Sequence, residues 1–173
     1  MKIIDLSPNV LRYAGISGGS RCYIELFQTF ERDGWNMRRI QINSHDGTHV
    51  NVPIHGTKGG KTLNDYGLED FCGPAQLYDS AIEMPRCGVL FRDQNIDATI
   101  ASEIKKIRPR FVGLSSDLEF DIEIEKDLLR AGIISYERLC NLGKLPKRFM
   151  FYGMPLNIKD GDGSPVRAFA VID

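Results

Sequence analysis

Histidine is scarce in this sequence, with three among 173 residues, and tryptophan occurs once. Neither sign of charge is in excess, because 22 basic and 23 acidic residues leave a net charge of −1. This balance argues against a nucleic-acid or anionic-lipid partner. No apolar run approaches the length of a membrane span, and residues 1–6 lack the pattern of a signal peptide. We therefore expect a cytoplasmic protein that acts on a small molecule.

The four cysteines are scattered along the chain and form no C-x-x-C pair. A disulfide framework would require a secreted protein, of which the sequence gives no sign, so we expect reduced, structural thiols. The length suits a single domain over residues 1–173. We expect it to bury about two-thirds of the surface that the unfolded chain exposes.

Short runs rich in β-branched and aromatic residues dominate the sequence and predict strands. They cover residues 2–6, 21–28, 38–43, 76–79, 88–92, 110–114, 132–136, 149–158 and 166–172. Near the end of the 149–158 run, Met154, Leu156 and Ile158 alternate with polar residues and proline. This alternation predicts a half-buried strand, with Pro155 at an edge or a bulge.

Two segments carry helical patterns. Isoleucines recur at spacings of four, four and three from Ile96 to Ile107, which makes one apolar stripe and predicts a helix that ends before Pro109. A second helix is predicted over residues 121–131, with Gly132 as its C-terminal stop. Many strands with few helices predict an α/β domain with mixed sheets.

All three histidines lie in one eleven-residue window. Its candidate polar side chains are His45, His49, Asn51 and His55. Glycine and proline in the window argue against a helix, and on an extended chain every offset among the four residues is even, so all can project to one side. Imidazoles on one face suit a metal site or a general base. The alternative, unrelated polar residues on a loop, is disfavoured because no histidine occurs elsewhere.

This window resembles the His-x-Gly-Thr-His-x-Asp-x-Pro-x-His signature of the cyclase and kynurenine-formamidase family. The matching residues are His45, Gly47, Thr48, His49, Pro53 and His55. Segments from 4–7 to 161–168 resemble the family in the same order, so the likeness spans nearly the whole chain. It implies a swivelling β/β/α domain that assembles as a homo-dimer or homo-tetramer, with active sites near subunit contacts.

The resemblance also implies a metal site and an acid/base. Carried over by position, His45, His49 and Glu137 are the candidate ligands for zinc or manganese. His55 is the candidate catalytic acid/base. In the family, a later histidine and the aspartate of the signature complete a site for zinc or manganese.

Two of those family ligands are missing. Asn51 stands where the family has aspartate and, being neutral, cannot bridge two cations. No histidine follows His55, although Glu125 lies near the expected position and could substitute. We therefore expect at most one zinc or manganese ion, bound weakly or absent. The predicted catalytic set is His55 with Asn51 and Glu137, and backbone amides of Gly47 and Thr48, or Asn51, would stabilise an oxyanion.

Three functions are compatible with this pattern. The first is a divergent enzyme acting on an acyl substrate by cyclisation, lactone or amide chemistry. The second is a catalytically inactive family member that serves as a binding or oligomeric partner, and the third is a small-molecule sensor. Retention of the three histidines with Glu137 favours the enzyme. The resemblance also implies that Tyr13 or Arg21 contacts the substrate.

Overall fold

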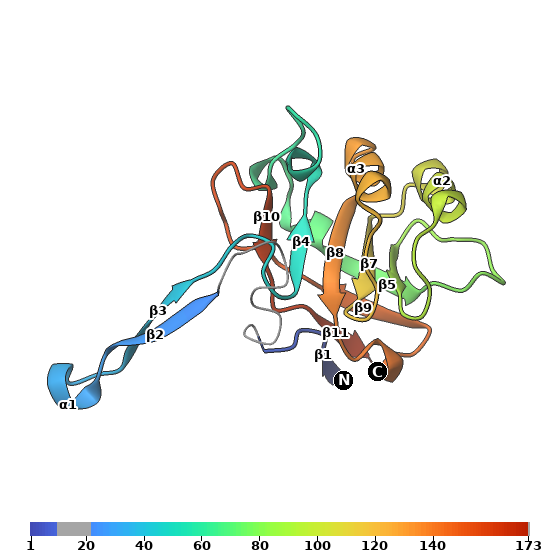
Figure 1. Ribbon diagram of the computed structural model, residues 1–173. Helices are drawn as coiled ribbons and strands as arrows, with labels where there is room; N and C mark the ends of the chain where they lie inside the picture. Colours follow the sequence, from blue (N-terminus) through green and yellow to red (C-terminus); the bar gives the residue numbers. More distant parts are fainter. Residues whose placement is uncertain (10–21, 173) are drawn as a thin grey trace.

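A nine-stranded mixed sheet forms the body of the protein in the computed structural model, which describes residues 1–9 and 22–172 (Figure 1). Its strand order is β1-β11-β9-β5-β6-β7-β8-β4-β10, in which β5 to β8 run parallel and the remaining pairs are antiparallel. The strands are β1 (Lys2–Asp5), β4 (His49–Asn51), β5 (Cys72–Leu77), β6 (Gly88–Phe91), β7 (Phe111–Ser115), β8 (Ile134–Leu139), β9 (Arg148–Tyr152), β10 (Gly163–Pro165) and β11 (Phe169–Ile172). Tyr13 and Arg21 lie outside the described residues.

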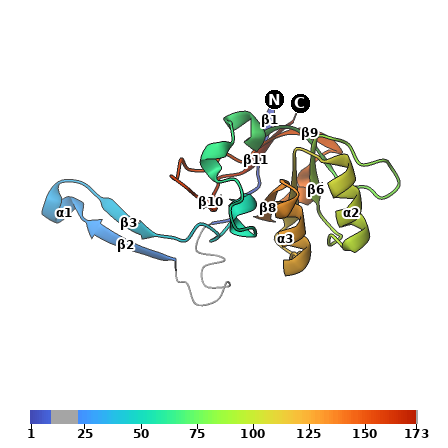
Figure 2. The ribbon, with the colours of Figure 1, turned by 90° about the horizontal axis from the view of Figure 1, so that it is seen from above.

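Helices α2 (Ala98–Ile107) and α3 (Ile122–Arg130) lie side by side along the parallel strands (Figures 1 and 2). The apolar stripe of α2 is buried at Ile100 and Ile104, as its spacing predicted. Asp97 caps the N-terminus of α2 by accepting from the backbone N–H of Ile100 at 2.8 Å. Gly132 follows α3 with φ of 83°, which confirms its predicted role as a stop. In the described residues, no helix is long and apolar enough to cross a membrane.

The core is divided between the two faces of the parallel strands. Val89 and Phe91 pack with the helices, whereas Leu90, between them on β6, packs on the other side. Strand alternation explains this division, because successive side chains point to opposite faces. Tyr136 is fully buried on the second side, and its hydroxyl bonds to a backbone carbonyl at 3.0 Å. The mixed α/β prediction is confirmed.

A hairpin projects from the body as a separate two-stranded sheet (Figures 1 and 2). It consists of β2 (Tyr23–Gln28), the short helix α1 (Phe30–Asp33) and β3 (Met37–Gln41). Gly34 closes α1 in the left-handed conformation, with φ of 77°. We call residues 23–41 the arm.

The predicted strand over 149–158 is wrong beyond Tyr152. Residues 153–158 are not a strand, and Met154, Leu156 and Ile158 remain 36–60% exposed. Pro155 has no N–H for a ladder, and the N–H of Leu156 instead bonds to Ser164 Oγ at 2.9 Å. Residues 163–165, which none of the predicted strands covers, form strand β10.

Candidate active site

Strand β4 carries two of the predicted site residues. It pairs with β8 on one side and β10 on the other, which fixes its orientation. His49 and Asn51 are two residues apart and therefore share a face, on which Glu137 lies opposite His49 in the register of β8. His49 Nε2 lies 3.2 Å from Glu137 Oε1, and Asn51 Nδ2 donates to the same oxygen at 2.8 Å. The structure thus brings these three predicted residues together.

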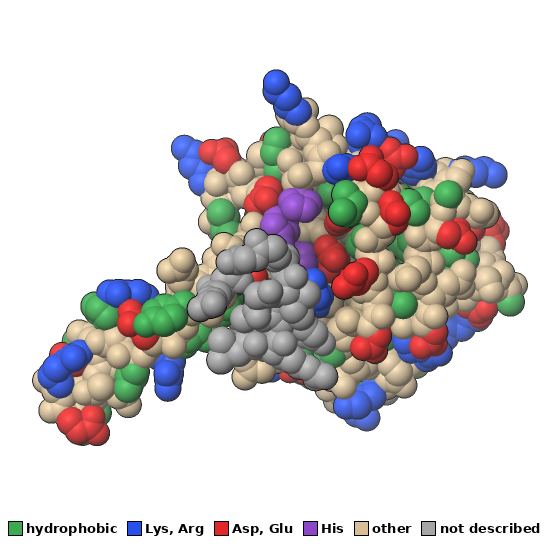
Figure 3. All heavy atoms as spheres, viewed as in Figure 1, with side chains coloured by type: hydrophobic (Ala, Val, Ile, Leu, Met, Phe, Trp, Pro, Cys, Tyr) green, Lys and Arg blue, Asp and Glu red, His purple; other side chains and the backbone are tan. Residues whose placement is uncertain are grey.

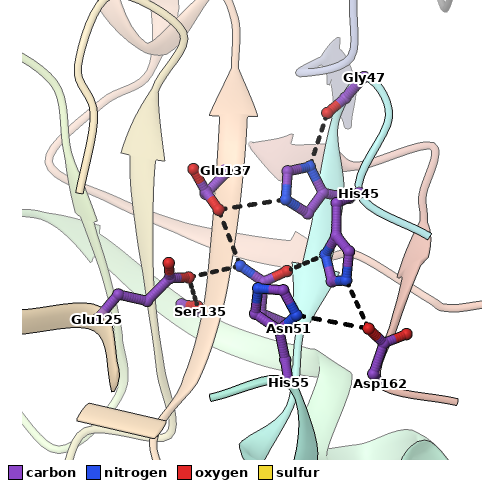
Figure 4. A network of polar contacts seen from close by, with 9 residues as sticks. His45, Gly47, Asn51, His55, Glu125, Ser135, Glu137 and Asp162 are labelled. Carbon is purple, nitrogen blue, oxygen red and sulfur yellow. Dashed lines mark hydrogen bonds and ion pairs between the residues drawn. The ribbon is translucent and has the colours of Figure 1, made fainter. Parts of the chain in front are cut away.

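Glu125 reaches the same cluster from helix α3 (Figure 4). Its Oε1 accepts hydrogen bonds from Asn51 Nδ2 at 2.6 Å and from Ser135 Oγ at 3.3 Å. The sequence suggested Glu125 only as a substitute for a missing histidine. Its carboxylate faces the cluster directly.

The other two histidines lie beside Asn51, with their ring planes inclined by 37°. The ring centroids of His45 and His55 are 3.9 Å apart. His45 Nε2 and His55 Nδ1 lie 2.8 Å and 3.4 Å from one oxygen, Oδ2 of Asp162 (Figure 4). A carboxylate oxygen accepts, so each nitrogen carries a proton where its bond forms. Sequence reasoning missed Asp162, because a carboxylate in a Gly-Asp-Gly segment has the pattern of an ordinary turn.

The extended chain suggested by the even offsets is only partly present. Only His49–Asn51 forms a strand, His45 lies in the turn before it, and His55 ends a 3₁₀ turn that begins at Pro53. Proline suits that first position because its φ is already helical and its missing N–H is not needed. The imidazoles converge because both turns fold back toward β4.

Two glycines permit this packing. Gly47 has φ of 68°, in the left-handed region that favours glycine, and its carbonyl accepts from His49 Nδ1 at 2.8 Å. A Cβ at Gly163 would lie 2.6 Å from His45 Cε1. Both imidazoles therefore rest against backbone that a larger residue would displace.

The two buried carboxyl groups differ in acidity. Burial, together with the negative charge of Glu137, raises the pKa of Glu125 to about 7. Burial would also raise the pKa of Glu137, but its hydrogen bonds with His49 and Asn51 and the charge of His49 lower it to about 2. At neutral pH one carboxylate is therefore fully ionised while its neighbour is near its midpoint.

The surroundings of His55 favour its neutral form. Burial and the charge of His45 lower the pKa of His55, while the hydrogen bond and charge of Asp162 act in the opposite direction. A neutral imidazole at neutral pH results, which is the form that can accept a proton. The side chain of His55 is 34% exposed, against 4% for His49. Figure 3 shows histidine side chains at the surface of this face, with acidic side chains beside them.

Among the described residues, one set of three ligating side chains is compact enough to hold a cation. The ligand atoms of His45, His55 and Asp162 all lie within 4.8 Å of one another. Two imidazoles and a carboxylate are a common donor set for a single catalytic zinc. This set shares only His45 with the one predicted from the sequence.

The predicted ligands His49 and Glu137 meet instead around the amide of Asn51. An amide N–H donates a hydrogen bond and is not a metal ligand. Here the amide nitrogen lies between the oxygens of Glu125 and Glu137. These residues therefore do not fit a pair of cations bridged at position 51.

Residues 4–125 match the family model described as "Putative cyclase". The chain belongs to this Cyclase family. The matched stretch contains the three histidines and Asn51, whereas Glu137 and Asp162 lie beyond it. The cyclase-family chain is also similar to kynurenine formamidases. The kynurenine formamidase of Salinibacter ruber is 25% identical to this chain, over 97% of this chain and 96% of that protein. That of Geobacillus thermodenitrificans is 27% identical, over 95% of each.

Two solved structures share the fold of this chain. Isatin hydrolase A from Labrenzia aggregata superposes with a TM-score of 0.80 at 21% identity, over 98% of this chain and 93% of that one. A protein described as a "Potential Metal-Dependent Hydrolase With Cyclase Activity" gives 0.72 at 21% identity, over 98% and 96%. The predicted swivelling β/β/α fold is confirmed. The family match and the similar kynurenine formamidases agree with the expectation of a hydrolase or cyclase.

Proposed function

We propose that this cyclase-family protein is a hydrolase or cyclase that acts on an acyl substrate and uses His55 as its general acid/base. The position of His55 carries the proposal: its ring lies against that of His45, its Nδ1 faces Asp162, and a third of its side chain is open to solvent. A catalytic base must be reachable and also held in one orientation. His55 meets both conditions.

The hydrogen bond to Asp162 determines which ring nitrogen of His55 carries the proton. With Nδ1 donating to Asp162, the lone pair of neutral His55 lies on Nε2. In a hydrolysis, Nε2 takes a proton from water while the water oxygen attacks the acyl carbon, and the proton then passes to the leaving nitrogen or oxygen. In a cyclisation, the same nitrogen deprotonates a nucleophile within the substrate, which attacks the acyl carbon, and the proton then passes to the group that leaves. The Asp162 carboxylate stabilises the imidazolium in both cases.

The oxyanion formed at the carbonyl requires N–H donors. We assign this role to the backbone amides of Gly47 and Thr48, which precede β4. The side chain of Asn51 is the weaker candidate, because its nitrogen already donates to Glu125 and Glu137. Asn51 and Glu137 then shape the site and hold His49.

Aryl acyl compounds are the first substrates to test, since similar proteins are kynurenine formamidases and an isatin hydrolase. The purified protein is assayed with formylkynurenine, isatin and a simple aryl lactone. Turnover of any of them supports an enzyme. A folded protein that converts none of the three favours an inactive member that acts as a binding partner.

We further propose that turnover does not depend on a tightly bound zinc or manganese ion. The neutral Asn51 supplies neither the charge nor the bridging oxygens of a carboxylate. The test is treatment with a strong chelator, removal of the chelator and assay of turnover. If the chelator abolishes activity and added zinc or manganese restores it, this proposal is wrong.

The arm supports the expected homo-oligomer. Its exposed apolar side chains are Tyr23, Leu26, Phe27, Phe30, Trp35, Met37 and Ile40, each 42–66% exposed. A lone two-stranded hairpin is marginally stable in water, so a projecting arm with this surface needs a partner. We propose that it packs on a second copy of the chain.

Light scattering at micromolar concentration tests this contact. We expect a dimer or tetramer mass for the native protein and a monomer mass for the double variant Phe30→Glu, Trp35→Lys, with an unchanged circular dichroism spectrum. Ile122→Lys is the control, because Ile122 is 68% exposed on α3, outside the arm. A native protein that is monomeric would refute the proposal.

A further inference from the structure

Two carboxylates and one amide form the centre of the buried cluster. Glu125 comes from α3 and Glu137 from β8, and their Oε1 atoms lie 2.6 Å and 2.8 Å from the same nitrogen, Asn51 Nδ2. Asn51 has no solvent-exposed surface. Two acceptors that converge in a buried site need a shared source of positive charge or donated protons.

The amide can supply both donors because of how it is oriented. The carboxamide has two N–H groups, one for each carboxylate, and its Oδ1 lies 2.8 Å from His45 Nδ1. The reverse orientation would place Oδ1 2.8 Å from the oxygen of Glu137, which is ionised at neutral pH, and two acceptors would then face each other. The carboxylates therefore fix the amide, with nitrogen toward Glu125 and Glu137.

We propose that the Asn51 carboxamide takes the place of a cation between Glu125 and Glu137, so that this chain holds the carboxylate pair together without a metal. The inference deepens the proposed function, since it concerns the same site, but it requires no substrate. It also gives Glu125 a role, as the second acceptor of the amide bridge. A cation between the two carboxylates would have to displace the amide and break its bond to His45.

Metal-dependent stability tests the proposal. Melting temperatures are measured after exhaustive chelation, with and without Mn²⁺, for the native protein, Asn51→Asp and Asn51→Leu. Both variants lose the two donors, so both should melt roughly 5–10 °C lower without metal. Mn²⁺ should restore Asn51→Asp, because a third carboxylate creates a ligand set, and should leave Asn51→Leu unchanged.

The affinity for Mn²⁺ is a second way to compare the native protein with Asn51→Asp. Partners in the outer shell of a metal typically change its affinity 10–100-fold, so a new direct ligand should change it by at least about 100-fold. We expect Mn²⁺ competition with a chromophoric chelator to show this gain in Asn51→Asp. Adding Glu125→Gln should remove most of it. Asn64→Asp is the control, since Asn64 lies on the surface and bonds to Asn157, so it should bind no more Mn²⁺ than the native protein.

The native protein provides a measurement that holds even where the variants do not fold. The side-chain amide signals of Asn51 should exchange slowly with water, because both N–H groups are hydrogen-bonded in a buried site. The proposal is overturned if Mn²⁺ raises the native melting temperature and Glu125→Gln abolishes that rise, or if Asn51→Leu is as stable as the native protein. Because none of these readings is an activity, a failed substrate search leaves their outcome unaffected.

Discussion

Neutralising Glu125 should stabilise the protein, and the gain should depend on pH. The pKa of Glu125 rises from 4.5 to about 7 on folding, because burial and the charge of Glu137 favour its protonated form. A group whose folded pKa is raised favours folding below its unfolded pKa, and this contribution is lost as pH rises through the folded pKa. Above pH 7 the ionised carboxylate therefore opposes folding, whereas Glu125→Gln keeps an acceptor for Asn51 and carries no charge.

The size of the effect follows from the shift. Each pKa unit corresponds to 1.36 kcal/mol, so a shift from 4.5 to about 7 is worth about 3 kcal/mol at pH 8. By pH 5 the penalty falls below about 1 kcal/mol, because the folded protein is then protonated at this site. Glu125→Gln should therefore raise the free energy of unfolding by roughly 1–3 kcal/mol at pH 8, and by much less at pH 5.

Urea unfolding at pH 5, 6, 7 and 8 measures this difference. Glu123→Gln is the matched control, since Glu123 lies on the same helix with its side chain 79% exposed and pairs with Lys126. The control should show no trend with pH over this range. A Glu125→Gln variant whose stability change is the same at pH 5 and pH 8 would refute the assigned environment of Glu125.

Three further predictions follow from the site and the core. His55→Ala should lower kcat roughly 10²–10⁴-fold on any substrate found, with little change in the melting temperature, since His55 is partly exposed. Asp162→Asn should lower kcat/KM and move its acid limb to lower pH, because His55 must be neutral to act and loses the carboxylate that raises its pKa. Tyr136→Phe should cost about 1–2 kcal/mol in urea unfolding, because it removes a buried hydroxyl bonded to the Gly153 carbonyl.

Elements with a strong local pattern were predictable. The isoleucine stripe of α2 and the stop at Gly132 depend on residues close in sequence, and both are confirmed. The signature histidines were found for the same reason. Strand β10 and Asp162 were not, because their roles arise only when residues 162–165 lie against β4, more than a hundred residues away. The alternation of apolar residues over 154–158 led to a wrong strand prediction, because Pro155 lacks the backbone donor that a strand needs.

The position of β4 in the sheet determines when the site can form during synthesis. Residues 49–51 emerge from the ribosome early, but their partners are residues 135–137 and 163–165. Contacts between such distant segments form late, since a long loop must close first. The imidazoles and carboxylates would therefore assemble only after β10 has been translated. A nascent chain stalled before residue 160 should lack the site and keep one edge of β4 open to pairing with other chains.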